Sequence, residues 1–301
     1  MGNIIKLARP QFLVAGLALF LFGAFIAVLL GSPFALARLL LGCLIILPAQ
    51  LSVNFGNDYF DVVSDQPDSG TFISGGSGIL LKHPELRPTV KWIITGLIIF
   101  SLIIGVIFQQ LYAYPFWMLG FVMLGNLLGW IYSAPPVRLL ERGLGEICFV
   151  SVIGILLPTM GYLTLRGTLD PAGLFFLLPL VCYAFVFILS VEIPDLEADQ
   201  IGGKHNWITR LGRRFGFLAI GFFLLLATGW FLLAPRFYAE RIPIDFRLIG
   251  LLSALPLLPG LLGMLWQPTN RQPATLITTV IVIGLTIFSV LLDVYLLILI
   301  V

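Results

Sequence analysis

Two acidic clusters contain the residues of this sequence whose types and spacing could support chemistry. The first cluster reads Asn57-Asp58-Tyr59-Phe60-Asp61-Val62-Val63-Ser64-Asp65. Asn57, Asp61 and Asp65 recur at every fourth residue, so on a helix they form one stripe. Carboxylates crowded in this way repel one another unless a cation joins them. Oxygen ligands without histidine or cysteine suit Mg²⁺, whose coordination substrate phosphates can complete. The alternative is a solvated helix end with an acidic cap.

The second cluster reads Glu192-Ile193-Pro194-Asp195-Leu196-Glu197-Ala198-Asp199. Asp195 and Asp199 are again four residues apart, and Glu192 lies about one turn earlier. Each cluster ends an apolar stretch, and carboxylates at membrane depth are costly and usually functional. Two acidic stripes that face each other imply more than one metal ion with a polyanionic ligand between them. A diphosphate is the natural candidate for that ligand.

Basic side chains near these clusters could hold the same diphosphate. Arg138 ends the stretch Tyr132-Ser133-Ala134-Pro135-Pro136-Val137-Arg138, and Lys204 follows two glycines. Both can clamp phosphoryl oxygens, although the positive charge of cytoplasmic loops explains either one alone equally well. The run Gly75-Gly76-Ser77-Gly78 could offer backbone N–H groups to an anion, but we favour a flexible loop. We assign the remaining loop residues to membrane topology and lipid headgroup contacts (Arg210, Arg213, Arg214) or to isolated loop positions without metal-ligand spacing (His83, His205).

The elements that position these clusters are predicted to be membrane-spanning helices. Of the 301 residues, 59% are hydrophobic and only 11% are charged, and the mean hydropathy is +1.05. A soluble domain of this length needs far more charge to cover its surface. Apolar stretches of about twenty residues, the length that crosses a bilayer, recur along the whole chain. We predict an all-α membrane bundle of nine spans in one domain, residues 1–301, with spans at about 11–31, 34–57, 89–109, 113–132, 145–166, 171–194, 215–235, 247–266 and 275–300.

The distribution of lysine and arginine predicts the orientation of the bundle. Twelve of the seventeen basic residues fall in the N-terminal segment and in alternate loops that include 58–88, 133–144 and 195–214, and five fall on the opposite side. The excess of positive charge marks the cytoplasmic side. We therefore expect the N-terminus and both acidic clusters to face the cytoplasm in the cell (inner) membrane. Membrane lipid is an expected partner, and nucleic acid is not.

The motifs closely resemble those of the UbiA-type intramembrane prenyltransferases. That family carries Asn-Asp-x-x-Asp-x-x-x-Asp at the end of its second helix, which residues 57–65 match at every fixed position, and Asp-x-x-x-Asp at the end of its sixth, matched by Asp195 and Asp199. The intervening Tyr-Ser-x-Pro-Pro-x-Arg stretch and the spacing of the spans are also similar. The resemblance implies a nine-helix bundle around a central cavity open to lipid, in which two Mg²⁺ ions hold an isoprenyl diphosphate.

The resemblance also implies roles for individual residues. It implies that one ion binds to Asn57, Asp61 and Asp65 and the other to Asp195 and Asp199, with Asp58 and Glu192 as supporting ligands. Arg138 and Lys204 would stabilise the leaving group, and Tyr132 would line the substrate site. The candidate catalytic residues are accordingly Asp61, Asp195, Arg138 and Lys204. The reaction expected is ionisation of the allylic diphosphate followed by attack of an electron-rich aromatic carbon.

The segment that follows the first motif indicates which acceptor to expect. Branches of the family that act on 4-hydroxybenzoate, haem or chlorophyllide commonly have an arginine-rich stretch there, whereas Gln66 to Gly78 contains no arginine. With Arg9-Pro10 before the first span, this looks like the 1,4-dihydroxy-2-naphthoate branch of menaquinone, and hence quinone, biosynthesis. The alternatives are another acceptor, such as 4-hydroxybenzoate, homogentisate or a lipid alcohol, a non-catalytic lipid-binding relative, and an ion-coupled transporter. A transporter would place its carboxylates near the bilayer midplane rather than at helix ends.

Overall fold

The computed structural model describes residues 2–62, 77–238 and 242–301, and within these residues every regular element is helical. The first half of the chain forms α1 Gly2–Ala8, α2 Pro10–Leu29, α3 Leu36–Asp61, α4 Ile79–Lys82, η1 Pro84–Leu86, α5 Arg87–Tyr112, α6 Trp117–Ser133, η2 Leu139–Arg142 and α7 Gly145–Phe149. The second half forms η3 Val150–Leu156, α8 Leu157–Arg166, α9 Pro171–Glu192, η4 Ile193–Asp195, α10 Leu196–Ile201, α11 Trp207–Leu233, α12 Pro235–Tyr238, α13 Phe246–Leu252, α14 Ala254–Trp266 and α15 Arg271–Ile300. The predicted all-α membrane fold is confirmed.

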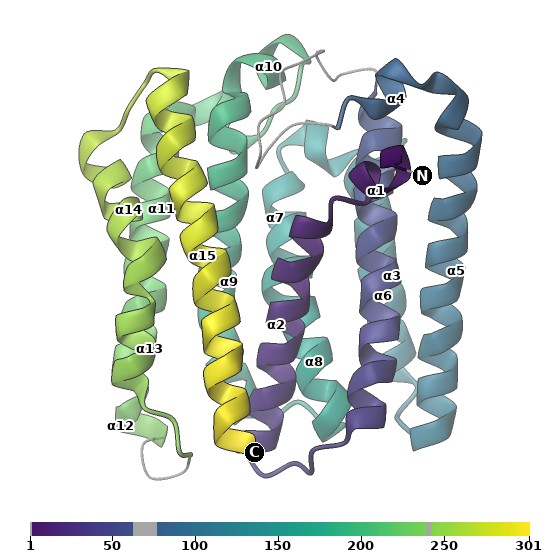
Figure 1. The fold of residues 1–301 in the computed structure, drawn as a ribbon, viewed down its shortest axis with the longest axis vertical. Coiled ribbons are helices and arrows are strands. Elements are labelled where there is room, and N and C mark those ends of the chain that lie inside the picture. Colours follow the sequence, from purple (N-terminus) through teal and green to yellow (C-terminus); the bar gives the residue numbers. More distant parts are fainter. Residues whose placement is uncertain (1, 63–76, 239–241) are drawn as a thin grey trace.

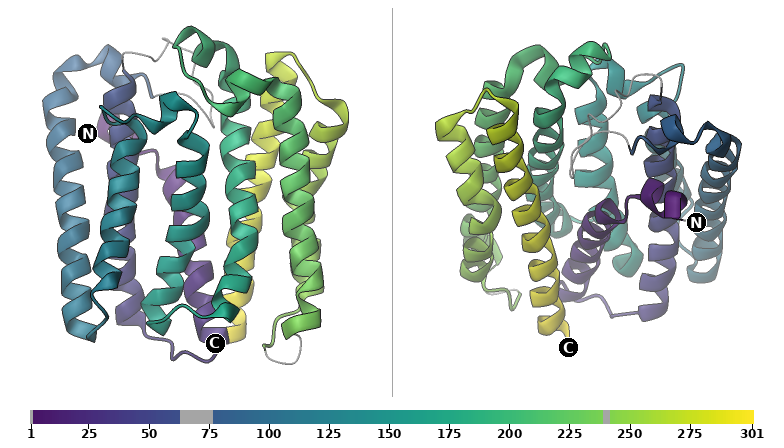
Figure 2. Two further views of the ribbon diagram at one scale, coloured as in Figure 1. Left: turned by 180° about the vertical axis from the view of Figure 1, so that it is seen from behind. Right: turned by 45° about the horizontal axis from the view of Figure 1, so that its top comes forward.

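The long helices run roughly parallel to one another from end to end of the molecule (Figure 1). The short helices α4 and α10 are both at one end of the bundle, and the C-terminus is at the other. The same arrangement is visible from behind and with the top brought forward (Figure 2). Many large apolar side chains on the outside of the bundle are exposed, including Trp92, Leu265 and Phe116. A surface of this kind is stable against lipid and not against water, so the chain is an integral membrane protein.

The number of spans differs from the expectation. Among the described residues, seven helices are long and apolar enough to cross a membrane. An eighth candidate is the pair α13 and α14, which meet at a bend of 47°. Helix α6 is apolar but has only 17 residues. Helical segments therefore occupy all nine predicted positions, but the count of nine spans is not confirmed.

Two helices extend beyond the apolar windows that predicted them, because polar residues at their ends are also helical. Helix α3 continues past residue 57 to Asp61, so Asn57, Asp58 and Asp61 of the first acidic cluster lie on the helix itself. Helix α11 begins at Trp207, eight residues before the predicted span, and is kinked at Gly212, where the backbone is not helical. The Asn206 side chain accepts a hydrogen bond from the backbone N–H of Thr209 and caps the first turn of α11. A side-chain cap stabilises a polar first turn that hydropathy alone does not identify.

Helices α2 and α8 pack closely against each other at two glycines. A Cβ atom added at Gly161 of α8 would lie 1.8 Å from the carbonyl oxygen of Phe20 on α2. One added at Gly23 of α2 would lie 1.9 Å from the carbonyl oxygen of Pro158. The two helix backbones therefore touch, as small residues allow in membrane bundles. The neighbouring residues Phe22 of α2 and Met160 of α8 line the cavity described below.

At the end of the bundle opposite to α10, one carboxylate fixes the turn between α8 and α9. Asp170 caps α9 by accepting from the Gly173 N–H at 2.8 Å, and it also accepts from Tyr162 Oη at 2.9 Å and Arg166 Nε at 2.6 Å. Partial burial raises the pKa of Asp170, but these hydrogen bonds and the Arg166 charge outweigh it, so the pKa is lowered overall. Asp170 is therefore a stabilising anion.

Candidate active site

Three residues of the first acidic cluster, Asn57, Asp58 and Asp61, lie on the last turns of α3 and face the interior. Asn57 Oδ1 accepts a hydrogen bond from Ser133 Oγ of α6 at 2.6 Å. Asp58 Oδ1 accepts from Arg9 Nη2 at 3.0 Å and from the Ser77 N–H at 2.9 Å, while its other oxygen is buried without a hydrogen-bond partner among the described residues. Asp61 is also buried. The predicted ligand Asp65 lies outside the described residues, so its place in the stripe stays a prediction.

The second acidic cluster lies where α9 ends. Pro194 lies two residues after Glu192, in the short η4 turn, and the chain then continues as α10, so the acidic residues are distributed over a bend. Glu192 is buried, and neither of its carboxylate oxygens has a hydrogen-bond partner in the described part of the chain. Asp199 is buried on α10 and accepts from Asn206 Nδ2 at 2.7 Å. Because Asn206 also caps α11, it fixes the direction of the Asp199 side chain.

Lys204 joins the two clusters. Its ammonium nitrogen lies 4.0 Å from Asp61 Oδ2 on α3 and 3.4 Å from Asp199 Oδ1 on α10. These carboxylates are 138 residues apart in the sequence, yet they converge on one cation. The prediction that the two acidic stripes face each other is thus supported by a shared ion-pair partner. An ammonium group at this position shows that the site attracts positive charge.

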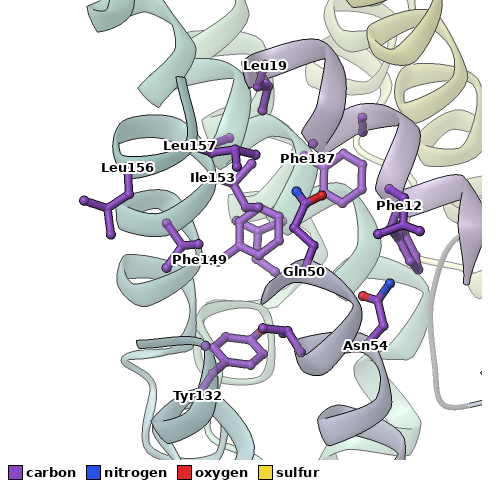
Figure 3. Close-up of a pocket in the computed structure, with 18 of the residues that line it drawn as sticks. Phe12, Leu19, Gln50, Asn54, Tyr132, Phe149, Ile153, Leu156, Leu157 and Phe187 are labelled. Carbon is purple, nitrogen blue, oxygen red and sulfur yellow. The ribbon is translucent and has the colours of Figure 1, made fainter. Parts of the chain in front are cut away.

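The two clusters form one end of a large interior cavity. Its volume is about 330 Å³, within the range of ligand sites. Figure 3 shows side chains that line it, with Gln50 and Asn54 projecting from α3 and aromatic rings projecting from other helices. The rings of Phe149 and Phe187 are stacked with their centroids 5.7 Å apart and their planes within 7° of parallel. Polar groups thus gather at one end, and the remaining wall is mostly apolar.

All but two of the predicted site residues line this cavity. Those that do are Asn57, Asp58, Asp61, Tyr132, Glu192, Asp195, Asp199 and Lys204. The exceptions are Asp65, which is not described, and Arg138. Arg138 does not line the cavity, and its Nη1 donates to Glu141 Oε1 at 2.7 Å. Its predicted contact with the diphosphate stays a prediction. Among the described residues, no three His, Cys, Asp or Glu side chains form a group that could hold a metal ion on their own.

The assignment of Arg213 to lipid headgroup contacts is wrong. Arg213 is buried and forms a two-pronged ion pair with Glu197, at 2.6 Å for each hydrogen bond. It also donates to the carbonyl oxygens of Ile193 and Thr269. It therefore ties α10 to α11 and to the segment before α15. The physical reason is that a buried backbone carbonyl and a carboxylate together satisfy the guanidinium better than a lipid surface does.

Several cavity residues were missed by reasoning from the sequence. Arg9 pairs with Asp58, as described above, although it was considered only as part of an Arg-Pro pair. Gln50 lies seven residues before Asn57 on α3, and its Oε1 is buried without a partner in the described structure. Asp293 lines the cavity from α15. A lone carboxylate within a long apolar helix is itself a signal of function, and it could have identified Asp293.

Comparisons with known proteins identify the family. The model of the UbiA prenyltransferase family matches residues 16–290. The chain belongs to the UbiA prenyltransferase family. It is therefore a prenyltransferase by family, and the resemblance seen in its motifs is confirmed at that level.

Solved structures show the same fold. A UbiA homologue from Archaeoglobus fulgidus bound to GPP and Mg²⁺ superimposes with a TM-score of 0.68 at 18% identity, covering 99% of each chain. The same homologue bound to DMAPP and Mg²⁺ gives a TM-score of 0.67 at 17% identity, again covering 99% of each chain. A digeranylgeranylglyceryl phosphate synthase gives 0.58 at 14% identity, covering 96% of this chain and 98% of that one. A search of curated proteins finds no match.

Proposed function

We propose that this UbiA-family protein transfers an isoprenyl group from an isoprenyl diphosphate to 1,4-dihydroxy-2-naphthoate in menaquinone biosynthesis. The observation that carries the proposal is the convergence of two acidic helix ends on one end of an apolar cavity, with Lys204 between them. With divalent cations bound at its acidic end, such a cavity would suit a ligand with an anionic head and an apolar tail. The Archaeoglobus fulgidus homologue, which shares the fold, has been seen with two such ligands, GPP and DMAPP, together with Mg²⁺.

The residues present fit Mg²⁺. Glu192 and one oxygen of Asp58 are buried acceptors without partners among the described residues, and a buried carboxylate needs a cation or a donor. Asn57, Asp61, Asp195 and Asp199 add oxygen ligands of the kind that Mg²⁺ prefers. When bound, Mg²⁺ would act as a Lewis acid on the diphosphate oxygens. We assign Asn57, Asp61 and Asp65 to one ion and Asp195 and Asp199 to the other.

The chain's own side chains contribute charge and exclude water. Lys204 would hold the diphosphate oxygens as the C1–O bond of the donor breaks and the electron pair leaves with the diphosphate. The aromatic and aliphatic wall would keep water from the allylic cation, and ring faces such as those of Phe149 and Phe187 can stabilise it. A new carbon–carbon bond then forms to the acceptor ring, and the attacked carbon releases a proton or CO₂.

The proposed acceptor is supported by the arginine-free segment from Gln66 to Gly78, most of which lies outside the described residues. It is also supported by the unpartnered Oε1 of Gln50, an acceptor for a ring hydroxyl. A Cβ atom at Gly16 of α2 would lie 1.7 Å from Gln50 Nε2, so α2 closely confines this amide. A bicyclic ring also gains more from burial against the apolar wall than a single ring does.

The test is transfer of a labelled prenyl group by the purified protein in detergent or lipid. The measurement is kcat/KM for 1,4-dihydroxy-2-naphthoate and for 4-hydroxybenzoate with the same donor, with Mg²⁺ and after EDTA treatment. We expect a ratio that favours the naphthoate and no transfer after metal removal. A ratio that favours 4-hydroxybenzoate would refute the acceptor alone. Full turnover in a metal-stripped preparation would refute the metal-dependent mechanism.

A further inference from the structure

A second carboxylate site lies in the cavity, far from the acidic end. Asp293 lies on α15, lines the cavity and is only 7% exposed. Its Oδ1 has no hydrogen-bond partner in the described structure. The nearby cavity hydroxyls on its own helix do not donate to it, because Thr286 donates to the Val282 carbonyl and Ser289 to the Leu285 carbonyl. An unpartnered carboxyl group facing a mostly apolar cavity is costly to cover.

The depth of Asp293 follows from the helices that carry it. Helix α15 starts at the acidic end, where Arg271 Nε donates to the Pro194 carbonyl at 3.0 Å, and it runs opposite to α9. Phe288 contacts Tyr183 of α9 with ring centroids 5.2 Å apart. Tyr183 is nine residues from Glu192, and Asp293 is five residues beyond Phe288, which places Asp293 roughly 20 Å below Glu192 at about 1.5 Å per residue. A second measure counts residues along α15 from Arg271 at the acidic end, and it places Asp293 roughly 30 Å from that end.

Asp293 is the deepest cavity residue that α15 contributes. On three other helices the lining residues that end the cavity are apolar, namely Leu180 on α9, Ile45 on α3 and Phe22 on α2. An apolar chain that fills the space above Asp293 is in contact with a mostly apolar wall, in which Gln50, Asn126 and Tyr183 have neutral polar atoms without hydrogen-bond partners among the described residues. A chain that continues past Asp293 must in addition cover its carboxylate, and an ionised carboxylate costs more to cover than an amide or a hydroxyl. The depth of Asp293 in the cavity therefore limits the length of an apolar chain that can bind without this cost.

We infer that Asp293 sets the length of prenyl donor that the enzyme accepts. The inference rests on the proposed prenyl transfer, because it takes the diphosphate to lie at the acidic end. An isoprene unit contributes four carbon–carbon bonds of about 1.5 Å to the chain, or roughly 5 Å when extended. A donor of four units is about 20 Å long and reaches no further than Asp293. A donor of eight units, about 40 Å, must pass it by either measure of the depth.

The test compares geranylgeranyl diphosphate, with four units, and octaprenyl diphosphate, with eight, as donors to one acceptor. For the wild type we expect kcat/KM to be lower for the longer donor by about tenfold or more, the ratio that corresponds to covering one polar group without a partner. Asp293→Leu should reduce this ratio to within about threefold. Leucine is larger than aspartate. If residue 293 limited the donor length by its size alone, Asp293→Leu would therefore strengthen the preference for the shorter donor.

Two matched variants separate polarity from other effects. Asp293→Asn keeps the size and the polarity and should keep the wild-type preference. Ser289→Ala changes the same wall of the cavity at a hydroxyl that already has a backbone partner, and it should also leave the preference unchanged. An unchanged ratio in Asp293→Leu, or a wild type that uses both donors equally, would overturn this inference and leave prenyl transfer intact. Absence of transfer with every donor would overturn the proposed function and this inference together.

Discussion

Replacement of Lys204 by methionine tests whether the two acidic clusters form one electrostatic unit. Methionine keeps an unbranched side chain only one heavy atom shorter than that of lysine but removes its charge. The ammonium group lies 3.4 Å from Asp199 and 4.0 Å from Asp61, and at an effective dielectric constant of about 20 each attraction is roughly 4 to 5 kcal/mol before desolvation is subtracted. Loss of one partner of a buried ion pair typically costs about 3–5 kcal/mol.

The assay is thermal unfolding of purified Lys204→Met, with and without Mg²⁺. In metal-free buffer the apparent Tm should fall by roughly 6 to 20 °C, at about 2–4 °C per kcal/mol. Addition of Mg²⁺ should raise the Tm of the variant more than that of the wild type, because a metal ion can neutralise the carboxylates that the lysine no longer pairs. Transfer activity should fall about 10²- to 10³-fold, the loss expected when one leaving-group contact is removed.

The control for this experiment is Lys91→Met. Lys91 is exposed on α5 and belongs to the same basic side of the chain, but it does not line the cavity. Its replacement should change stability by less than about 1 kcal/mol and leave transfer unchanged. Equal Tm values for Lys204→Met and the wild type in metal-free buffer would refute a stabilising role for the ion pairs of Lys204 with Asp61 and Asp199. A variant that loses stability without responding to Mg²⁺ would refute the expectation that Mg²⁺ can neutralise the carboxylates that Lys204 pairs.

Three further predictions concern the acidic motif, the far end of the bundle and the orientation. Asp61→Ala should reduce transfer by at least about a thousandfold with no loss of folded protein on size-exclusion chromatography, because it removes a metal ligand rather than packing; near-normal transfer would exclude Asp61 as a ligand. Asp170→Ala should lower the unfolding free energy at neutral pH by about 1–2 kcal/mol. Because the folded pKa of Asp170 lies below its unfolded value, this difference should be full above about pH 4 and shrink as the pH falls through the folded pKa; a difference that grows on acidification would contradict the assignment. Cysteines introduced at 66–80 should react with impermeant reagents only from the cytoplasmic side, and labelling from outside would reverse the proposed orientation.

The part of the site that could be predicted from the sequence is the part encoded by short-range spacing. Residues four apart on one helix must share a face, so the stripe from Asn57 to Asp61 needed no knowledge of the fold. The helical repeat also placed Asp195 and Asp199 together. The convergence of α3 and α10 depends on tertiary packing, but it could be anticipated because both acidic clusters follow spans of the same direction. Lys204 was a candidate because it follows two glycines close to the second acidic cluster; the structure places it near Asp61 and Asp199, and its role in leaving-group binding stays a prediction.

The parts that could not be predicted depend on contacts between distant segments. Arg213 was assigned to lipid because a basic residue next to a span is usually a topology signal. Its partners Glu197 and Thr269 lie 16 and 56 residues away, and no local pattern connects them. Asp293 was counted as part of an apolar span, because hydropathy averages over a window and hides a single carboxylate. The predicted number of spans differs from the structure for a related reason. A bend such as that between α13 and α14 does not change the amino-acid composition, so hydropathy counts the two helices as one straight span.

The balance of charge around the cavity explains why the chemistry depends on cations. At the acidic end, five carboxylates line the described cavity wall, from Asp58 to Asp199, whereas only two basic side chains do so, Arg9 and Lys204. Arg9 is already paired with Asp58, and Lys204 is shared between carboxylates. A diphosphate brings further negative charge, so it cannot enter this end of the cavity favourably by itself. The same carboxylates that repel the donor alone would bind it with divalent cations between them. The apolar remainder of the cavity cannot supply this compensation, so the proposed prenyl transfer requires the diphosphate to lie at the acidic end with its tail toward Asp293.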